Sequence, residues 1–280
     1  MPSRWLPHTR SSKPAPSTAN NDPDASLPTR EGVYLQEIDL KRTEADTDID
    51  IIAIHGLDTR SPNTWTWKDP RDPNNKSKWN NWLGPDMLSA KVNRARIFTC
   101  DWPADLFVSS DMIQMTIEEY AVPLLEGIES ALFTSNTRPQ DRPIFFIASC
   151  LGGLILIKSL VHADDKRNNY YRIRQATRGA VFLATPFRGT SFQDVAAWAE
   201  MTLKAKASTQ GRNVSRIIES VKGSTFELEQ SVSNFTRLCR DNDNPCEVFS
   251  FFELKKTSLP HKAFPWLPRW LDQKKQVSGV

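Results

Sequence analysis

The stretch that most constrains the fold of this chain runs from Arg142 to Leu160 and reads RPIFFIASCLGGLILIKSL. Pro143 to Ala148 is an apolar run of β-favouring residues without polar alternation, which is typical of a central strand covered on both faces. Leu151 to Leu160 has aliphatic residues on all sides and no proline, which indicates a buried helix. The stretch therefore predicts a strand, a one-residue corner at Cys150 and a helix.

The spacing around Cys150 matches the G-x-S-x-G nucleophile elbow of α/β-hydrolases, which exposes a reactive side chain on a sharp strand-to-helix turn. Ala148 and Gly152 fill the two small positions, where strand and helix approach closely. Cys150 stands where most enzymes of this fold have serine, and Ser149 is one residue too early for that place. A thiol is workable there, because thiolate is a strong nucleophile and a helix N-terminus lowers the pKa of a thiol. The alternative is a small buried cysteine without a chemical role.

Length and composition indicate an ordinary globular domain, because the 280 residues have average charged and hydrophobic fractions. Residues 1–30 are rich in Pro, Ser, Thr and Asn and predict a disordered leader, which leaves residues 31–280 as one α/β-hydrolase-like domain. The net charge of +3 is too small to indicate a nucleic-acid partner.

The four cysteines show no C-x-x-C spacing and no His-rich partner segment, so we expect no metal and no cofactor. They fit a reducing compartment better than a disulfide framework. We find no apolar run long enough for a transmembrane segment and no apolar signal sequence. The expected location is therefore intracellular and cytoplasmic.

Apolar runs that alternate with helical patterns predict a mostly parallel, doubly wound sheet with helices on both faces. Besides the strand before Cys150, we expect strands at Gly32–Leu40, Asp48–His55, Ala95–Asp101, Gly179–Ala184 and Cys246–Phe252. We expect helices at Trp79–Lys91, Asp111–Phe133 with a kink at Pro123, Phe192–Lys206 and Asn213–Cys239 with a break at Gly223.

The strand that ends in His55-Gly56 is the second notable feature, because α/β-hydrolases place an oxyanion donor on the loop after such a strand. The backbone N–H groups of Leu57 and Leu151 are the predicted donors for a developing oxyanion. We interpret His55 as a structural residue that orients this loop by hydrogen bonding. The tryptophan-rich loop at 58–84 has two open interpretations, a wall of an acyl pocket or a set of anchors that fix a polar loop to the body.

Several segments together resemble the α/β-hydrolase domain of the serine-active-site-containing, lipase- or esterase-like family found in fungal NACHT, ankyrin and TPR receptor proteins. The matching segments are IIAIHGLDTRSPNTWTW, ARIFTCDWPADLF, FFIASCLGGLILIKSL, GAVFLATPFRGT and FSFFE. They cover residues 48–253. The resemblance implies an intracellular enzyme for an apolar acyl substrate, with peripheral contact to a mitochondrial or ER membrane.

The resemblance also implies a triad in which Cys150 is the nucleophile and Glu253 the acid. The family's histidine lies in a later Asp-His segment that has no counterpart here, so the fold is expected to be shortened at its C-terminus. His261 is the one histidine after Glu253 and is the candidate base, although neither its spacing nor its flanking residues match the family; the alternative, which these mismatches favour, is a surface histidine. Phe187 replaces the histidine of the family's T-P-H-R-G segment, which removes a polar contact.

Two function hypotheses follow from these residues. The first is an acyl-ester hydrolase that uses Cys150 and passes through a thioester. The second is a catalytically impaired hydrolase-fold module for signalling or protein binding in a fungal receptor system. The altered nucleophile and the missing Asp-His segment favour the second hypothesis, and the combined motifs favour the first.

Overall fold

The computed structural model describes residues 32–38, 46–57, 59–105, 107–109, 114–133, 142–187, 212–214, 216–217, 220 and 225–252. Four of the sequence predictions lie outside these residues and are not tested by them. They are the leader at 1–30, the helix at 192–206, the acid Glu253 and the base His261.

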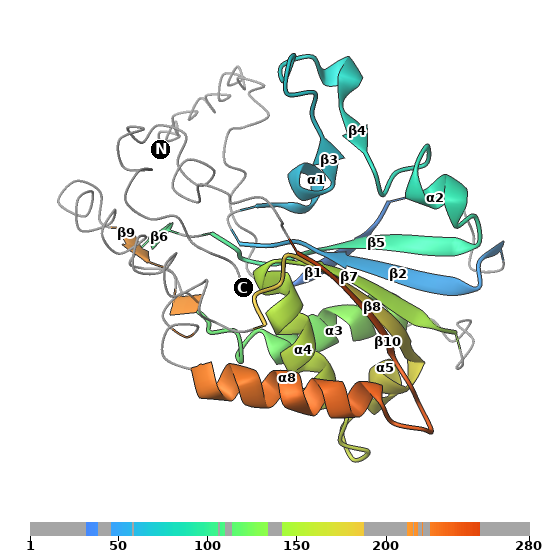
Figure 1. Cartoon of the computed structure of the whole chain (residues 1–280), viewed down its shortest axis with the longest axis vertical. Coiled ribbons are helices and arrows are strands. Elements are labelled where there is room, and N and C mark those ends of the chain that lie inside the picture. Colours follow the sequence, from blue (N-terminus) through green and yellow to red (C-terminus); the bar gives the residue numbers. More distant parts are fainter. Residues whose placement is uncertain are drawn as a thin grey trace, which may run out of the picture.

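The centre of the molecule is a six-stranded sheet with the strand order β1-β5-β2-β7-β8-β10 (Figure 1). The edge strand β1 is antiparallel to β5, and every other pairing in this sheet is parallel. This mostly parallel sheet confirms the predicted α/β-hydrolase fold. The strands are β1 (Tyr34–Glu37), β2 (Ile49–Ile54), β5 (Ala95–Asp101), β7 (Ile144–Ser149), β8 (Thr177–Leu183) and β10 (Glu247–Phe251).

Helices and short hairpins cover the two faces of the sheet (Figure 1). One face carries the long helices α3 (Ala121–Leu132), α4 (Leu151–Ala163) and α8 (Thr225–Cys239), and the short helix α5 (Tyr171–Ala176). The other face carries α1 (Ser61–Thr64), β3 (Thr66–Trp67), the 3₁₀ helix η2 (Lys76–Lys78), β4 (Asn80–Asn81) and α2 (Leu88–Lys91). A separate pair joins β6 (Phe107–Ser109) to β9 (Arg212–Val214).

Strand β2 shows why its sequence is apolar without alternation. Ile52 and Ile54 belong to the large core between the sheet and the long helices. Ile51 and Ala53 belong to a smaller core on the other face, which also contains Trp65. Successive side chains of a strand point to opposite faces, so a strand covered on both sides needs apolar residues at every position.

The predicted strands agree with the structure within about two residues at most ends, but three helix predictions were wrong in extent. The helix expected from Trp79 is only α2, and the helix expected from Asp111 begins at Ala121. Pro123 lies in the first turn of α3, where a backbone N–H has no partner within the helix, so it marks the helix start and not a kink. The start of the helix expected from Asn213 was wrong, because residues 212–214 pair with β6; residues 216–217 and 220 are helical, and α8 begins at Thr225.

The tryptophan-rich loop supports the anchor interpretation for two of its four indoles. Trp65 is 1% exposed and packs edge-on against Trp82, with ring centroids 5.3 Å apart. Both belong to the smaller core. Trp67 is exposed, and Trp79 lies under the ammonium group of Lys68, 4.2 Å from its ring centroid. The buried pair fixes the loop to the sheet.

Candidate active site

Cys150 occupies a sharp turn between the central strand β7 and helix α4. Its backbone has φ 52° and ψ −126°, a conformation that residues other than glycine rarely adopt. Such a residue costs about 1–3 kcal/mol and persists only when its surroundings hold it in place. The predicted strand, corner and helix are therefore present, and the side chain of Cys150 is partly exposed at the corner.

Three glycines allow neighbouring segments to close around this corner. A Cβ atom added to Gly152 would lie 2.3 Å from the carbonyl oxygen of His55, and one added to Gly56 would lie 2.8 Å from the Cβ of Cys150. A Cβ on Gly153 would lie 2.2 Å from the Oγ1 of Thr185. No side chain larger than hydrogen fits at these distances, so the ends of β2, β7 and β8 meet at one point.

Each of the two predicted oxyanion donors directly follows, in sequence, one of the two residues that touch at the corner, Gly56 and Cys150. Leu57 comes directly after Gly56, and Leu151 comes directly after Cys150. Leu151 is the first residue of α4, and the first N–H groups of a helix have no partner within it. Within the described residues, neither the Leu57 N–H nor the Leu151 N–H donates a hydrogen bond. Each of the two amides therefore follows a residue that takes part in the contact between Gly56 and Cys150.

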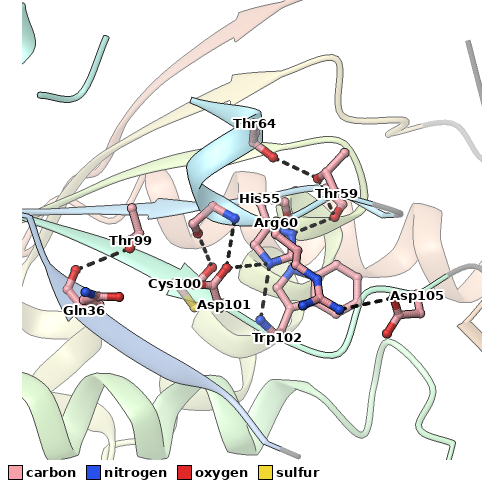
Figure 2. Close-up of polar contacts among 12 residues, drawn as sticks. Gln36, His55, Thr59, Arg60, Thr64, Thr99, Cys100, Asp101, Trp102 and Asp105 are labelled. Carbon is pink, nitrogen blue, oxygen red and sulfur yellow. Dashed lines mark hydrogen bonds and ion pairs between the residues drawn. The ribbon is translucent and has the colours of Figure 1, made fainter. Parts of the chain in front are cut away.

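His55 is completely buried and holds the loop on which Leu57 lies (Figure 2). Its Nδ1–H donates to the carbonyl oxygen of Gly56 at 2.8 Å, and its Nε2 lies 3.2 Å from Oδ1 of Asp101. The imidazole stacks on Trp102 at an interplanar angle of 10°, and the Trp102 Nε1–H donates to the His55 carbonyl oxygen at 3.0 Å. These contacts agree with the structural role expected for His55 and leave neither ring nitrogen without a partner.

Asp101, which the sequence did not single out, is the acidic partner in this network. Its Oδ1 also accepts a hydrogen bond from the backbone N–H of Ser61 at 2.9 Å. Burial raises the pKa of Asp101, but hydrogen bonds from His55 and Ser61 outweigh burial and bring the pKa below its ordinary value. Asp101 therefore stays ionised and joins the end of β5 to the loop after β2.

Further polar contacts fix the residues that follow Leu57 (Figure 2). The Thr59 hydroxyl donates to the Gly56 carbonyl oxygen at 3.1 Å and accepts from the Thr64 hydroxyl at 2.9 Å. Arg60 forms an ion pair of 3.9 Å with Asp105. The candidate oxyanion loop is therefore held on both sides of Leu57.

A second strained corner lies beside Cys150. Ala184, at the end of β8, has φ 52°, and β7 and β8 are in register so that Ser149 is opposite Leu183. The Cys150 N–H donates to the Leu183 carbonyl oxygen at 2.9 Å, and the Ala184 N–H donates to the carbonyl oxygen of Phe251 at 2.7 Å. Among the described residues these are the two non-glycine residues with positive φ, and they are neighbours across the strand ends.

The apolar replacement at Phe187 is accommodated by packing. Its ring meets Phe182 edge-on, with centroids 5.2 Å apart, and it contacts the large core. The adjacent Thr185 is 9% exposed, and its hydroxyl has no hydrogen-bond partner. Phe187 thus contributes apolar contact where the resemblance implied a polar group.

The described residues supply no imidazole to this site other than the engaged ring of His55. His162 is exposed near the end of α4, as expected for a solvated helix terminus. The predicted acid, Glu253, directly follows Phe252, the last residue that the structure describes. In the part of the chain that is described, no cluster of three or more His, Cys, Asp or Glu side chains is arranged to hold a metal ion.

None of the described helices combines the length and apolar character needed to cross a membrane. No protein-family profile matches this sequence, and no curated protein matches it either.

Solved structures of similar arrangement share little sequence with this chain. The lipase BlEst2 of Bacillus licheniformis is 16% identical over 78% of this chain and 70% of its own, with a TM-score of 0.45. Est1E of Butyrivibrio proteoclasticus is 9% identical over 78% of this chain and 82% of its own, with a TM-score of 0.40. A thermophilic esterase from Thermogutta terrifontis is 11% identical over 86% of this chain and 90% of its own, with a TM-score of 0.35. Because these sequence identities and TM-scores are low, the assignment to the α/β-hydrolase fold rests on the strand order and on the Cys150 corner.

Proposed function

We propose that this protein attacks acyl esters through the Cys150 thiolate and forms a thioester with an apolar acyl group. The observation that supports the proposal most directly is the backbone of Cys150, held at positive φ between a buried strand and a buried helix, with Gly56 packed against its side chain. Strain of this kind is retained where it presents a reactive group.

In the proposed reaction the sulfur attacks the carbonyl carbon of the ester, and the carbonyl oxygen becomes an oxyanion. The N–H groups of Leu57 and Leu151 donate to that oxyanion, which is the interaction that most often dominates stabilisation in acyl transfer. The C–O bond to the alcohol then breaks, the alcohol leaves with a proton, and the acyl group stays on sulfur. Water hydrolyses the thioester in a second step and restores the thiol.

Both steps need a base, and the candidate is His261 with Glu253 as its orienting acid; because the residues around His261 do not match those around the family's histidine, we propose that it is an inefficient base. The two residues follow β10, whose carboxyl end lies beside Ala184 and therefore near the Cys150 corner. Without a positioned base, a thiolate can still be acylated, but deacylation by water is slow. We therefore expect acylation to be faster than deacylation in this protein.

A second candidate is a non-catalytic hydrolase-fold module for signalling or protein binding in a fungal receptor system. The specific observation in its favour is that both nitrogens of His55 are engaged, so the described part of the chain offers no base to Cys150. Peripheral membrane contact and a cytoplasmic, mitochondrial or ER location belong to the same family-based proposal.

Hydrolysis of a short-chain p-nitrophenyl ester separates the two candidates. The wild type should release about one p-nitrophenol per chain in a burst, followed by slow turnover. Cys150→Ala should lose the burst, and the matched control Cys239→Ser should keep it. Cys150→Ser should not restore turnover, because the deficit lies in the base. The absence of a burst in the wild type would favour the binding module, and rapid turnover that His261→Ala abolishes would identify His261 as an effective base.

A further inference from the structure

Two thiols other than Cys150 lie where helix α8 passes into strand β10. Cys239 is the last residue of α8, and Cys246 directly precedes β10. The Cys246 N–H donates to the Cys239 carbonyl oxygen at 3.0 Å, so the six residues between them form a closed loop. The two thiols lie close enough for each to shift the pKa of the other, and the Cys246 thiol also donates to the carbonyl oxygen of Glu247 at 3.8 Å. Residues joined by a backbone hydrogen bond have Cα atoms about 5–6 Å apart, which is within the range that a disulfide spans.

Arg174 of α5 holds the two ends of this loop together. Its Nη2–H groups donate to the carbonyl oxygens of Leu238 at 2.8 Å and Asn244 at 2.9 Å, and the Asn244 side chain donates back to the Arg174 carbonyl oxygen at 3.0 Å. Arg174 is 1% exposed, and its Nη1 is buried without a hydrogen-bond partner. The guanidinium is therefore fixed next to the cysteines, and the described residues leave one of its donor groups without an acceptor.

The surroundings of the two thiols give them different acidities. The hydrogen bond from Cys239 lowers the pKa of Cys246 most, burial opposes this effect, and the positive charges of Arg174 and Arg178 lower the pKa further. The same hydrogen bond raises the pKa of Cys239, and burial adds to that increase. The pair thus shares its proton unequally, and the thiolate form, which is the reactive one, is favoured on Cys246.

We propose that Cys239 and Cys246 form a thiol–disulfide redox site that accepts a low-molecular-weight disulfide, such as glutathione disulfide, as its oxidant. One protein thiolate attacks a sulfur of glutathione disulfide, forms a mixed disulfide and releases one glutathione thiolate. The other cysteine, as thiolate, attacks the protein sulfur of the mixed disulfide and releases the second glutathione. Two protein thiols are oxidised by two electrons, the oxidant is reduced to two glutathione molecules, and these take up the two protons.

Closure of the disulfide would tie the end of α8 to the start of β10 by a covalent bond. The closed loop contains few residues, so the chain-entropy model predicts stabilisation at the low end of the usual range for disulfides. The expected observable is a rise in Tm of several degrees on oxidation, which a dithiol reductant reverses. Cys150 lies at the corner between β7 and α4 and is not part of this exchange.

The test is equilibration of the wild-type chain in glutathione buffers with a rising fraction of glutathione disulfide, followed by acid quenching and alkylation. Tryptic cleavage after Arg240 separates the two cysteines, so a Cys239–Cys246 disulfide appears as two linked peptides in a non-reducing digest. We expect this species to form before Cys100, which is completely buried and has a raised pKa, becomes modified.

Two variants serve as matched controls for this experiment. Cys239→Ser and Cys246→Ser should each abolish the linked peptides and leave at most a single glutathione adduct. Reversal of the rise in Tm by reductant should be seen in the wild type and in neither variant. The proposal is wrong if the linked peptides do not form in the wild type under conditions that glutathionylate its other thiols, or if Cys239 pairs with a different cysteine.

Discussion

The Cys150 corner and the β10 edge belong to the same parallel sheet but differ in how they are held. At the corner, Phe146 and Ala148 of β7 are completely buried, and so is Leu151 of α4. In β10 all five residues are exposed, and Phe249 is 58% exposed. The central strand has packing on both faces and hydrogen-bonded neighbours on both edges, whereas β10 pairs with β8 on one edge among the described residues.

This difference bears on catalysis, because the proposed chemistry divides between the two regions. The proposed nucleophile and the two proposed oxyanion donors belong to the corner, where three chain segments meet within van der Waals distance. The proposed acid and base follow β10. Arg174 clamps the loop before β10, at the end of the strand opposite to the one that the proposed acid and base follow. Catalysis that requires both regions is therefore limited by the less firmly held one.

The largest expected difference is in the loss of stability when a phenylalanine is replaced on the central strand β7 and on the edge strand β10. Phe146→Ala should destabilise the protein by about 3–5 kcal/mol, because it removes a completely buried ring and leaves a cavity. Phe249→Ala, on the exposed strand, should cost less than about 1 kcal/mol. Urea denaturation of both variants measures the difference. Equal losses would mean that the edge strand is packed as firmly as the centre.

The second prediction concerns the close approach at the corner. Gly152→Ala should cost about 3 kcal/mol, because the new methyl group would meet the backbone carbonyl oxygen of His55, which cannot rotate away. Gly179→Ala is the matched control. Its added methyl group would meet the Phe145 ring at 2.9 Å, and a side chain can move, so about 1 kcal/mol is expected. A smaller loss for Gly152→Ala than for Gly179→Ala in urea denaturation would contradict the packing at the corner.

The smallest of these effects is electrostatic and depends on pH. Asp101→Asn should cost about 1 kcal/mol near neutral pH, a value reduced by the partial exposure of the carboxylate. Because the pKa of Asp101 is lower in the folded state, its contribution is complete above the unfolded value of about 3.9. It is lost as the pH falls through the lower folded pKa. The stability difference between wild type and Asp101→Asn should therefore disappear in acid, whereas a constant difference at all pH values would contradict the lowered pKa of Asp101.

Much of the fold could be predicted from the sequence because its strands are apolar and continuous. The prediction for Ala95–Asp101 agrees with β5 residue for residue, and the corner at Cys150 follows from the spacing of small residues around it. The failures lie where long-range pairing decides the structure. Residues 212–214 form a strand because they pair with β6, and the local sequence pattern does not predict that pairing.

The His55 network shows the same limit at the candidate site. Ile54 is opposite Cys100 in the pairing of β2 with β5, so His55 and Asp101 continue side by side beyond the strand ends. Once those two strands are known to be parallel neighbours, the pair can be found from the register alone. Without the strand order, an aspartate 46 residues away carries no signal that it contacts His55. The positive φ of Ala184 was equally hidden, because alanine does not favour that conformation.

The most direct test of the central claim is to locate the acyl group after a single turnover. The protein is mixed with a short-chain p-nitrophenyl ester, quenched in acid and digested, and the modified residue is identified by mass spectrometry. The account predicts one acyl group on Cys150, as a thioester that neutral hydroxylamine removes. An acyl group on Ser149, or an unmodified Cys150 after prolonged incubation, would contradict it.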